Sequence, residues 1–307
     1  MDNKTEVFLG IDVGGTHVKI GLVDTNGRII EFGKEDTGLL RKSAQGFNKA
    51  FVEVVGKYLE KNPEVKHVGI GLPGLVSKDR TTTLEIPAIS ELNGFNLKAA
   101  LIENYPDIIF HLENDASAAA LGEFHFGKGN TADDYLFITL GTGIGSALIL
   151  DRKVFKGVRG NAMEVGHMLS RGNSRLEPLI GRNGILNMAQ KMMEEFPEEI
   201  GEMEGKELGI HLLVASAKNN NGIALRTFAE LGAILGEALV STIRILDVTE
   251  IYFGGGISAA LPFIKPELEK TIRQYLSAYY LSDLTISKAT LENDAGTLGA
   301  AALCFMD

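Results

Sequence analysis

The stretch FLGIDVGGTHVKIGLVD (residues 8–24) places a carboxylate and two glycines between two apolar runs. The apolar runs predict two strands, and Gly14 with Gly15 predicts the turn between them. Asp12 has two interpretations. It is either a turn-forming residue of an ordinary hairpin, or a carboxylate that holds a metal ion while backbone N–H groups of the turn hold phosphate.

The same pattern returns about 128 residues later as YLFITLGTGIGSALILD (residues 135–151). A repeated strand, glycine turn and strand predicts two lobes of similar topology, each an α/β layer with a turn at one end. We expect one lobe over residues 1–117 and 291–307 and the other over residues 118–290, with a cleft between them.

A third glycine cluster, at residues 254–256, follows another predicted strand. Taken alone, a glycine turn is more often structural, because hairpins commonly need glycine. Three turns at strand ends, two of them in a repeat, favour the binding of phosphate by unobstructed backbone N–H groups. A packing role stays the alternative for each cluster.

Composition narrows the class of protein. The chain has 307 residues, 45% of them hydrophobic, and a formal net charge of −10, which argues against a nucleic-acid surface. We find no apolar run of about 18 residues that could span a membrane, and the charged start predicts no signal peptide. Cys304 is the single cysteine, which excludes a disulfide within the chain and a cysteine-based zinc site. We therefore expect a cytoplasmic protein that binds neither nucleic acid nor membranes.

Apolar periodicity, with glycine and proline as breaks, predicts the remaining elements. Helices are expected over residues 43–61, 97–104, 174–196, 223–246, 261–279 and 296–305, and strands over residues 29–34, 65–76, 152–155, 248–258 and 284–288. Residues 107–127 are expected to form a strand followed at once by an alanine-rich helix.

Seven motifs together resemble the ROK family of sugar kinases and sugar-responsive repressors. They are LGIDVGGTHVKIGLVD, GIGLPGLV, ENDASAAALGE, TLGTGIGSALI, EVGH, YFGGGIS and DAGTLGAAAL, and they follow one another over nearly the whole chain. The resemblance implies a two-lobed actin-like ATPase (ribonuclease H-like) fold. It also implies transfer of phosphate from ATP, with Mg²⁺, to a sugar hydroxyl. We expect that hydroxyl to be the 6-hydroxyl of glucose or of an N-acetylhexosamine. Repressors of the family carry a DNA-binding segment ahead of the kinase-like part, and the few residues before the first predicted strand lead us to expect none.

Asp115 lies where a predicted strand meets the alanine-rich helix. From its position it is either the N-cap of that helix or a functional carboxylate held at a strand end. The resemblance implies that it is the general base that accepts the proton of the sugar hydroxyl. Asn114 beside it is expected to bind sugar hydroxyls through its amide, and Gly74 to let the backbone approach the substrate.

Glu164 and His167 stand three residues apart in EVGH, a spacing that suits metal ligands, a sugar clamp or a surface turn. The resemblance implies that Glu164 binds adjacent ring hydroxyls and that His167 binds sugar. Similar proteins also use the histidine for zinc, together with three cysteines that this chain lacks, so we expect no structural zinc. A plain structural histidine is the alternative. Glu177, in a Leu-Glu pair that resembles the one following the cysteine loop of those proteins, is the expected further hydroxyl acceptor.

The nucleotide is expected to contact the three turns. The residues concerned are Gly14, Gly15, Thr16, Gly141, Thr142, Gly143, Gly254, Gly255 and Gly256. Asp12 is expected to hold Mg²⁺ through water, and apolar surface on the helix over residues 223–246 to support a homodimer. Two rival classes are kept: a non-catalytic sugar sensor or pseudokinase on the same fold, and an ATPase of the actin or chaperone kind, which has no use for the sugar motifs.

Overall fold

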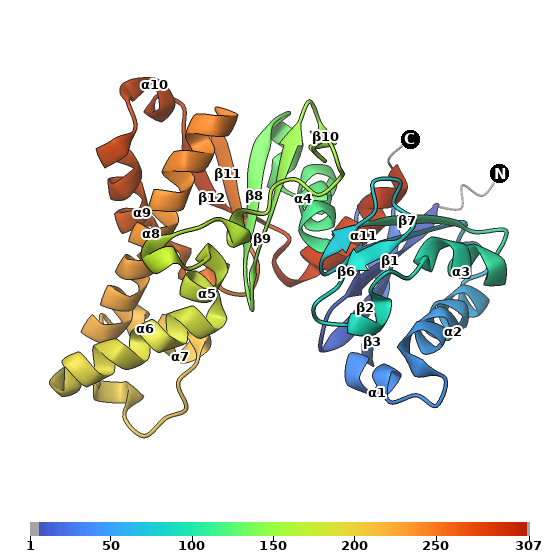
Figure 1. Ribbon diagram of the computed structural model, residues 1–307, viewed down its shortest axis with the longest axis horizontal. Coiled ribbons are helices and arrows are strands. Elements are labelled where there is room, and N and C mark those ends of the chain that lie inside the picture. Colours follow the sequence, from blue (N-terminus) through green and yellow to red (C-terminus); the bar gives the residue numbers. More distant parts are fainter. Residues whose placement is uncertain (1–5, 306–307) are drawn as a thin grey trace. The chain divides into compact units, whose positions relative to one another are not determined.

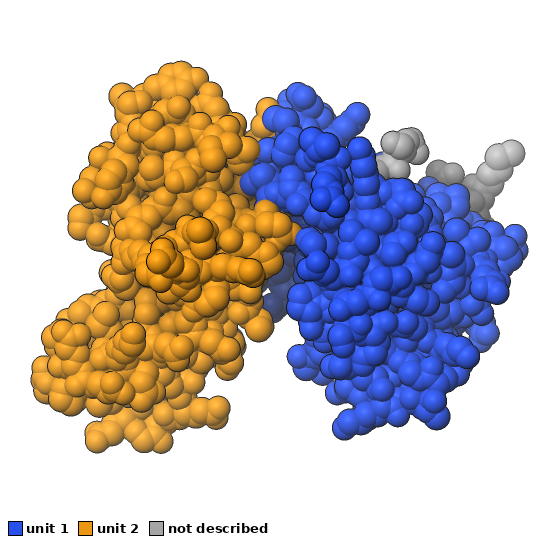
Figure 2. Space-filling model, in the orientation of Figure 1, with its two compact units in different colours: residues 1–133, 147–163, 290–307 blue, residues 134–146, 164–289 orange. Residues whose placement is uncertain are grey.

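The computed structural model describes residues 6–305, which form two compact units (Figure 2). Of these residues, unit 1 comprises 6–133, 147–163 and 290–305, and unit 2 comprises 134–146 and 164–289. Residues 118–133 and 147–163, expected in the second lobe, are therefore part of unit 1. The lobes as bodies with a cleft between them stay a prediction.

Unit 1 is built on a five-stranded sheet in the order β3-β2-β1-β4-β7. Figure 1 labels β1, β2, β3 and β7 of this sheet. The strands are β1 (Val7–Val13), β2 (His17–Asp24), β3 (Ile29–Asp36), β4 (His67–Leu72) and β7 (Ile109–Asn114). Strands β1, β4 and β7 are parallel, and their register pairs Asp12 with Gly71 and Leu72 with Asn114. Because carboxyl ends of parallel strands meet at one edge, this register gathers the predicted acidic and amide residues of unit 1 there.

Helices cover this sheet. They are α1 (Thr37–Arg41), α2 (Gly46–Lys61), α3 (Leu97–Asn104), α4 (Asp115–Phe126) and α11 (Ala295–Ala302), with a small sheet of β5 (Leu75–Val76) and β6 (Thr83–Glu85). Phe47 and Phe51 on α2 are buried in the core. The glycine and alanine content of α4 and α11 lets the two helices pack closely, since a Cβ on Gly122 would lie 2.8 Å from the Gly299 backbone.

A second five-stranded sheet has the order β10-β9-β8-β11-β12. Its strands are β8 (Tyr135–Leu140), β9 (Ile144–Leu150), β10 (Lys153–Val154), β11 (Glu250–Gly254) and β12 (Thr285–Lys288). The chain passes from unit 2 into unit 1 within β9, after Ser146. The repeated strand, glycine turn and strand is confirmed as β1–β2 and β8–β9.

The helices of unit 2 differ in part from the prediction. They are α5 (Leu176–Ile180), α6 (Arg182–Glu195), α7 (Ile210–Lys218), α8 (Gly222–Leu246), α9 (Leu261–Tyr275) and α10 (Ala278–Leu281). The single helix expected over residues 174–196 is wrong, because extended backbone at Gly181 separates α5 from α6. The helix expected over residues 261–279 ends at Tyr275, and α1 and α7 were not predicted. No helix within residues 6–305 has the length and hydropathy needed to cross a membrane.

Candidate active site

The glycine turn of unit 1 connects β1 to β2, and hydrogen bonds from the start of α1 hold it in place. Gly14 donates its backbone N–H to the carbonyl of His17 at 2.9 Å, which closes the turn. Thr37, fully buried at the start of α1, donates its hydroxyl to the Gly14 carbonyl at 2.7 Å and its backbone N–H to the Thr16 carbonyl at 3.0 Å. Thr37 thus fixes the turn, and it was not predicted as a site residue because no local sequence pattern links it to Gly14.

Asp12 lies within β1, one residue before its end, so it does not form the turn itself. Its Oδ2 is 3.3 Å from the Lys19 ammonium across the hairpin, and its side chain is 18% exposed. A Cβ on Gly296, in the first turn of α11, would lie 2.4 Å from the same Oδ2. The carboxylate is therefore packed against the start of a helix and remains partly accessible, as a group that meets a hydrated cation must be.

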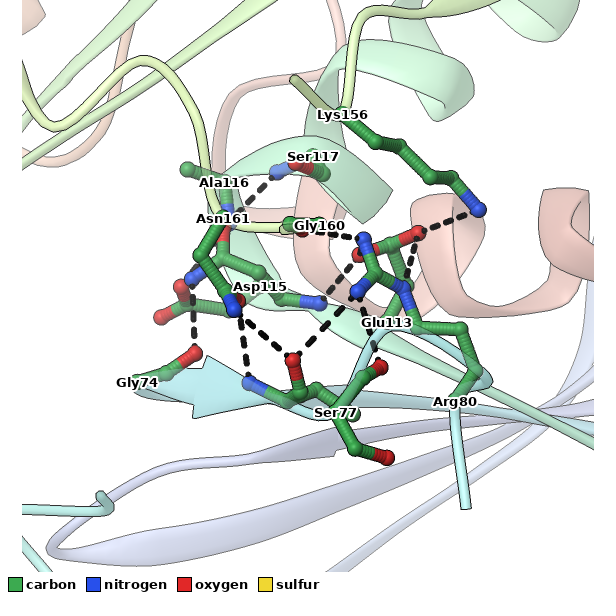
Figure 3. A network of polar contacts seen from close by, with 12 residues as sticks. Gly74, Ser77, Arg80, Glu113, Asp115, Ala116, Ser117, Lys156, Gly160 and Asn161 are labelled. Carbon is green, nitrogen blue, oxygen red and sulfur yellow. Dashed lines mark hydrogen bonds and ion pairs between the residues drawn. The ribbon is translucent and has the colours of Figure 1, made fainter. Parts of the chain in front are cut away.

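Asp115 is the first residue of α4 (Figure 3), and it directly follows Asn114, the last residue of β7. Asn114 is the N-cap, since its Oδ1 accepts the Ser117 backbone N–H at 3.1 Å, and its Nδ2 donates to the Gly74 carbonyl at 3.2 Å. Asp115 is the first residue of α4, and its Oδ1 accepts the Ala116 N–H at 2.8 Å. The N-cap interpretation of Asp115 is therefore wrong, because its neighbour takes that place.

Gly74 has a structural reason for being glycine. A Cβ there would lie 2.1 Å from the Glu85 carbonyl, so β5 and β6 could not approach as they do. Its own carbonyl is engaged by the Asn114 amide. The structure brings Gly74, Asn114 and Asp115 together, while their contact with substrate stays a prediction.

The glycine turn of unit 2 is fixed by Glu177, which lies in the first turn of α5. Gly141 N–H donates to the Gly143 carbonyl at 3.0 Å, and Ile144 N–H donates to Glu177 Oε2 at 2.8 Å. Arg182 N–H donates to the Gly141 carbonyl at 3.1 Å. The expected sugar residue Glu177 and the expected nucleotide turn are thus directly joined.

Glu164 and His167 lie close to Glu177 in unit 2. His167 Nδ1 is 3.7 Å from Glu164 Oε2, and the two side chains are 51% and 41% exposed. Burial raises the pKa of the Glu164 carboxyl, the His167 ring lowers it, and the charge of Glu177 raises it further. The exposure of His167 does not fit a core histidine. Within residues 6–305, no group of three or more His, Cys, Asp or Glu side chains is arranged to hold a metal ion.

The segment between His167 and Glu177 is ordered by polar contacts. Arg171 reaches α8, where its Nη1 lies 2.6 Å from Glu230 Oε1 and its Nε lies 2.8 Å from Glu237 Oε2. Ser170 and Ser174 close the loop with a backbone hydrogen bond of 2.8 Å. These contacts hold the loop whose two ends carry the expected sugar residues.

The third glycine cluster separates into two kinds of position. A Cβ on Gly254 would lie 2.7 Å from the Phe137 ring, and one on Gly255, whose φ is +81°, would lie 2.4 Å from the Leu140 carbonyl. Both glycines therefore have packing reasons. By contrast, apart from residues 255–257 themselves, no described atom lies within 4 Å of a Cβ placed on Gly256. Gly256 is the member of this cluster that best suits a ligand.

The expected site residues thus fall into two sets, one in each unit. Unit 1 holds Asp12, Gly14, Gly15, Thr16, Gly74, Asn114 and Asp115, and unit 2 holds Gly141, Thr142, Gly143, Glu164, His167, Glu177, Gly254, Gly255 and Gly256. In chemical terms, unit 1 supplies a carboxylate at a strand end and an anchored glycine turn. Unit 2 supplies hydrogen-bonding side chains beside a second turn.

Known proteins resemble this chain over nearly its whole length. The ROK family model matches residues 8–306. A β-glucoside kinase of Listeria monocytogenes is 29% identical over 296 residues, which is 94% of each chain. A candidate sugar kinase from Cytophaga hutchinsonii shares 39% identity with a TM-score of 0.93, over 98% of this chain and 100% of that one. A ROK family glucokinase from Streptomyces griseus, solved with glucose and AMPPNP, shares 29% identity with a TM-score of 0.80, over 97% and 99%. These likenesses confirm the expected α/β fold of the actin-like ATPase kind.

Proposed function

The chain belongs to the ROK family, and from that membership we infer that it is a sugar kinase, which transfers a phosphoryl group from ATP to a sugar hydroxyl. The observation that carries the proposal is the junction of β7 and α4. There Asp115 follows an asparagine whose amide is held by both the helix start and the Gly74 carbonyl. A carboxylate fixed in this way suits proton transfer, because a general base must be held in place.

Asp115 is the proposed general base. As the sugar oxygen forms its bond to the γ-phosphorus, the bond from that phosphorus to the β–γ bridging oxygen breaks and ADP leaves. The hydroxyl proton passes to the Asp115 carboxylate. Positioning and charge stabilisation supply most of the catalysis in reactions of this class, and the side chain serves to orient the nucleophile and accept its proton.

The nucleotide is proposed to lie against the glycine turns. Gly141 and Gly256 suit it, because outside residues 140–142 the nearest described atom to a Cβ on Gly141 is the Gly143 carbonyl oxygen, 3.9 Å away, and Gly256 is more open still. The turn at residues 14–16 is held by Thr37, so its backbone is in place before ligand arrives. Asp12, partly exposed, would hold Mg²⁺ through water, and the ion supplies neutralisation of phosphate charge when bound.

The sugar is proposed to be bound by Asn114, Glu164, His167 and Glu177. Hydroxyls both donate and accept hydrogen bonds, and carboxylates, an amide and an imidazole match them. The relatives named as glucokinase and β-glucoside kinase make glucose and a β-glucoside the first substrates to test, with the 6-hydroxyl as the acceptor.

We also retain a homodimer as a proposal, supported by Ile245, which is 78% exposed near the end of α8.

A coupled ADP-release assay with ATP, Mg²⁺ and a panel of hexoses, N-acetylhexosamines and β-glucosides tests the proposal. At least one sugar is expected to stimulate ADP release and to be recovered as its phosphate. Sugar binding without turnover would instead indicate a sensor or pseudokinase, and hydrolysis that ignores sugar would indicate an ATPase of the actin or chaperone kind.

The role of Asp115 is tested by Asp115→Asn in the same assay. Loss of a general base is expected to lower kcat by about 10²- to 10⁴-fold, while the sugar still binds in calorimetry. Asp107→Asn, which changes an exposed aspartate just before β7, is the matched control. If kcat of Asp115→Asn stays within about threefold of the unmodified chain, Asp115 is not the base.

A further inference from the structure

Glu113 precedes Asn114 and Asp115 and is not one of the expected site residues. Its side chain is 0% exposed. Its Oε1 accepts the backbone N–H of Asn114 at 3.0 Å, so the carboxylate directly contacts the main chain of the N-cap residue. A buried charge in this position has to be paired, because an isolated carboxylate out of water is very costly.

Two cations share this carboxylate, and we name the three residues the Glu113 cluster: Glu113, Arg80 and Lys156 (Figure 3). Arg80 binds the Glu113 carboxylate in a bidentate manner, since its Nη2 is 2.8 Å from Oε1 and its Nε is 3.0 Å from Oε2. Lys156 Nζ is 3.1 Å from Oε2. Paired guanidinium and carboxylate groups have defined geometry, so the cluster sets position as well as charge.

Arg80 extends the cluster to two further backbone segments. Its Nη1 donates to the Ser77 carbonyl at 3.1 Å, and its Nη2 donates to the Gly160 carbonyl at 2.7 Å. Arg80 itself has φ +56°, an uncommon conformation for a residue with a side chain. A Cβ on Gly160 would lie 2.9 Å from the guanidinium, so this approach needs glycine.

Asn161 completes the connection next to Gly160. Its Oδ1 accepts the Val76 N–H at 3.0 Å, and its Nδ2 donates to the Val76 carbonyl at 2.9 Å. Residues 156–161 are therefore tied to the end of β7 through Glu113 and to β5 through Val76. All of these residues belong to unit 1.

On the basis of the proposed kinase function, we propose that Glu113 is a positioning residue for Asn114 and Asp115. It acts through the Asn114 backbone and does not contact substrate. Stability alone is a weak reason for the cluster, because well-packed apolar side chains of similar volume usually stabilise as well as a buried ion pair. Apolar side chains, however, could not bind the carbonyls of Ser77 and Gly160 or the N–H of Asn114.

The test compares Glu113→Gln with Glu123→Gln in the full chain. Glu123 is the matched control, because it is also fully buried, lies at the far end of α4 and accepts the N–H groups of Lys128, Thr290 and Leu291. For Glu113→Gln we expect kcat for the sugar to fall about 30-fold or more, with the KM for ATP unchanged. Glu123→Gln should lower the melting temperature and leave kcat within about threefold.

A second readout does not depend on activity. Amide hydrogen exchange of the peptide over residues 114–117 is expected to be about tenfold faster in Glu113→Gln and unchanged in Glu123→Gln. Arg80→Lys should not preserve the geometry of the Glu113 cluster, since a lysine ammonium is a point charge and cannot bind a carboxylate through two nitrogens as arginine does. Unchanged exchange at residues 114–117, or equal losses of kcat in both glutamine variants, overturns the proposal. A chain that phosphorylates no sugar refutes the kinase function instead, and the exchange measurement still decides the role of Glu113.

Discussion

Gly143→Ala offers a sharp test of how the second glycine turn is built. A Cβ at Gly143 would lie 2.3 Å from Glu177 Oε2. Glu177 can withdraw, because Oε2 is the end of a flexible side chain, but it must retreat by about 1 Å to restore ordinary contact. That retreat breaks the hydrogen bond of 2.8 Å from Ile144 N–H.

The cost follows from the lost hydrogen bond. A hydrogen bond to a charged group contributes about 1.5–3 kcal/mol, and the half-buried setting of Glu177 points to the lower end. The melting temperature is then expected to fall by roughly 3–6 °C, measured by calorimetry without ligands. Because Glu177 is a proposed sugar ligand, kcat/KM for the sugar should also fall, by about 100-fold for a displacement of this size.

Gly141→Ala, two residues away in the same turn, is the matched control. Outside residues 140–142, the nearest described atom to its Cβ is 3.9 Å away, so the melting temperature should not change. If the open space is where phosphate binds, the KM for ATP should rise about tenfold while sugar affinity is preserved. Gly143→Ala should thus lower the melting temperature and kcat/KM for the sugar, whereas Gly141→Ala should raise only the KM for ATP.

A double-mutant cycle decides whether Glu177 is the cause. In a Glu177→Ala background, Gly143→Ala should cost almost nothing, because the group that it displaces is absent. The reasoning is refuted if Gly143→Ala keeps the unmodified melting temperature and sugar affinity. It is refuted equally if its full cost persists after Glu177 has been removed.

Two further predictions concern Glu164 and Thr37. Burial raises the pKa of Glu164 in the folded chain above its ordinary value of 4.5. The unfolded chain therefore loses this proton at a lower pH than the folded chain does, and the free energy of unfolding falls as pH rises from 4.5 through the raised pKa. Glu164→Gln should therefore raise the melting temperature at pH 7 and leave it unchanged below pH 4.5; equal melting temperatures throughout a pH series would contradict this. Thr37→Val removes the bond to the Gly14 carbonyl and should cost about 1 kcal/mol and raise the KM for ATP. Thr227→Val, which removes a hydroxyl bond within α8, should cost as much without changing that KM, and a shared change in KM would contradict the role of Thr37.

Much of the fold was predictable, because helices and hairpins leave local patterns of apolar residues and glycine in the sequence. The helix over Leu97–Asn104 has the predicted bounds, and the long helix α8 begins within one residue of its predicted start. The hairpins β1–β2 and β8–β9 were expected from apolar runs around glycine. The break at Gly181 was not predicted, and at the break Arg182 donates its N–H to the carbonyl of Gly141, in a segment distant along the chain, at 3.1 Å.

The candidate site divides in the same way. The motif that contains Asn114 and Asp115 placed them at a strand–helix junction, which the structure confirms. It left open whether Asp115 caps the helix or is a functional carboxylate, and the structure gives the cap to Asn114. Glu113 and Thr37 carried no local signal of their partners, since Arg80 is 33 residues from Glu113 and Gly14 is 23 residues from Thr37.

By itself, the sequence determined the repeated strand–turn–strand units, the α/β class and the order of the functional motifs, because each depends on the spacing of neighbouring residues. Only the tertiary structure decided which glycines pack against protein and which face open space. Only it showed that Glu177 holds the second turn and that a buried carboxylate holds the end of β7. Such roles depend on which atoms of distant segments come within hydrogen-bonding reach, and spacing along the chain carries no information about that distance.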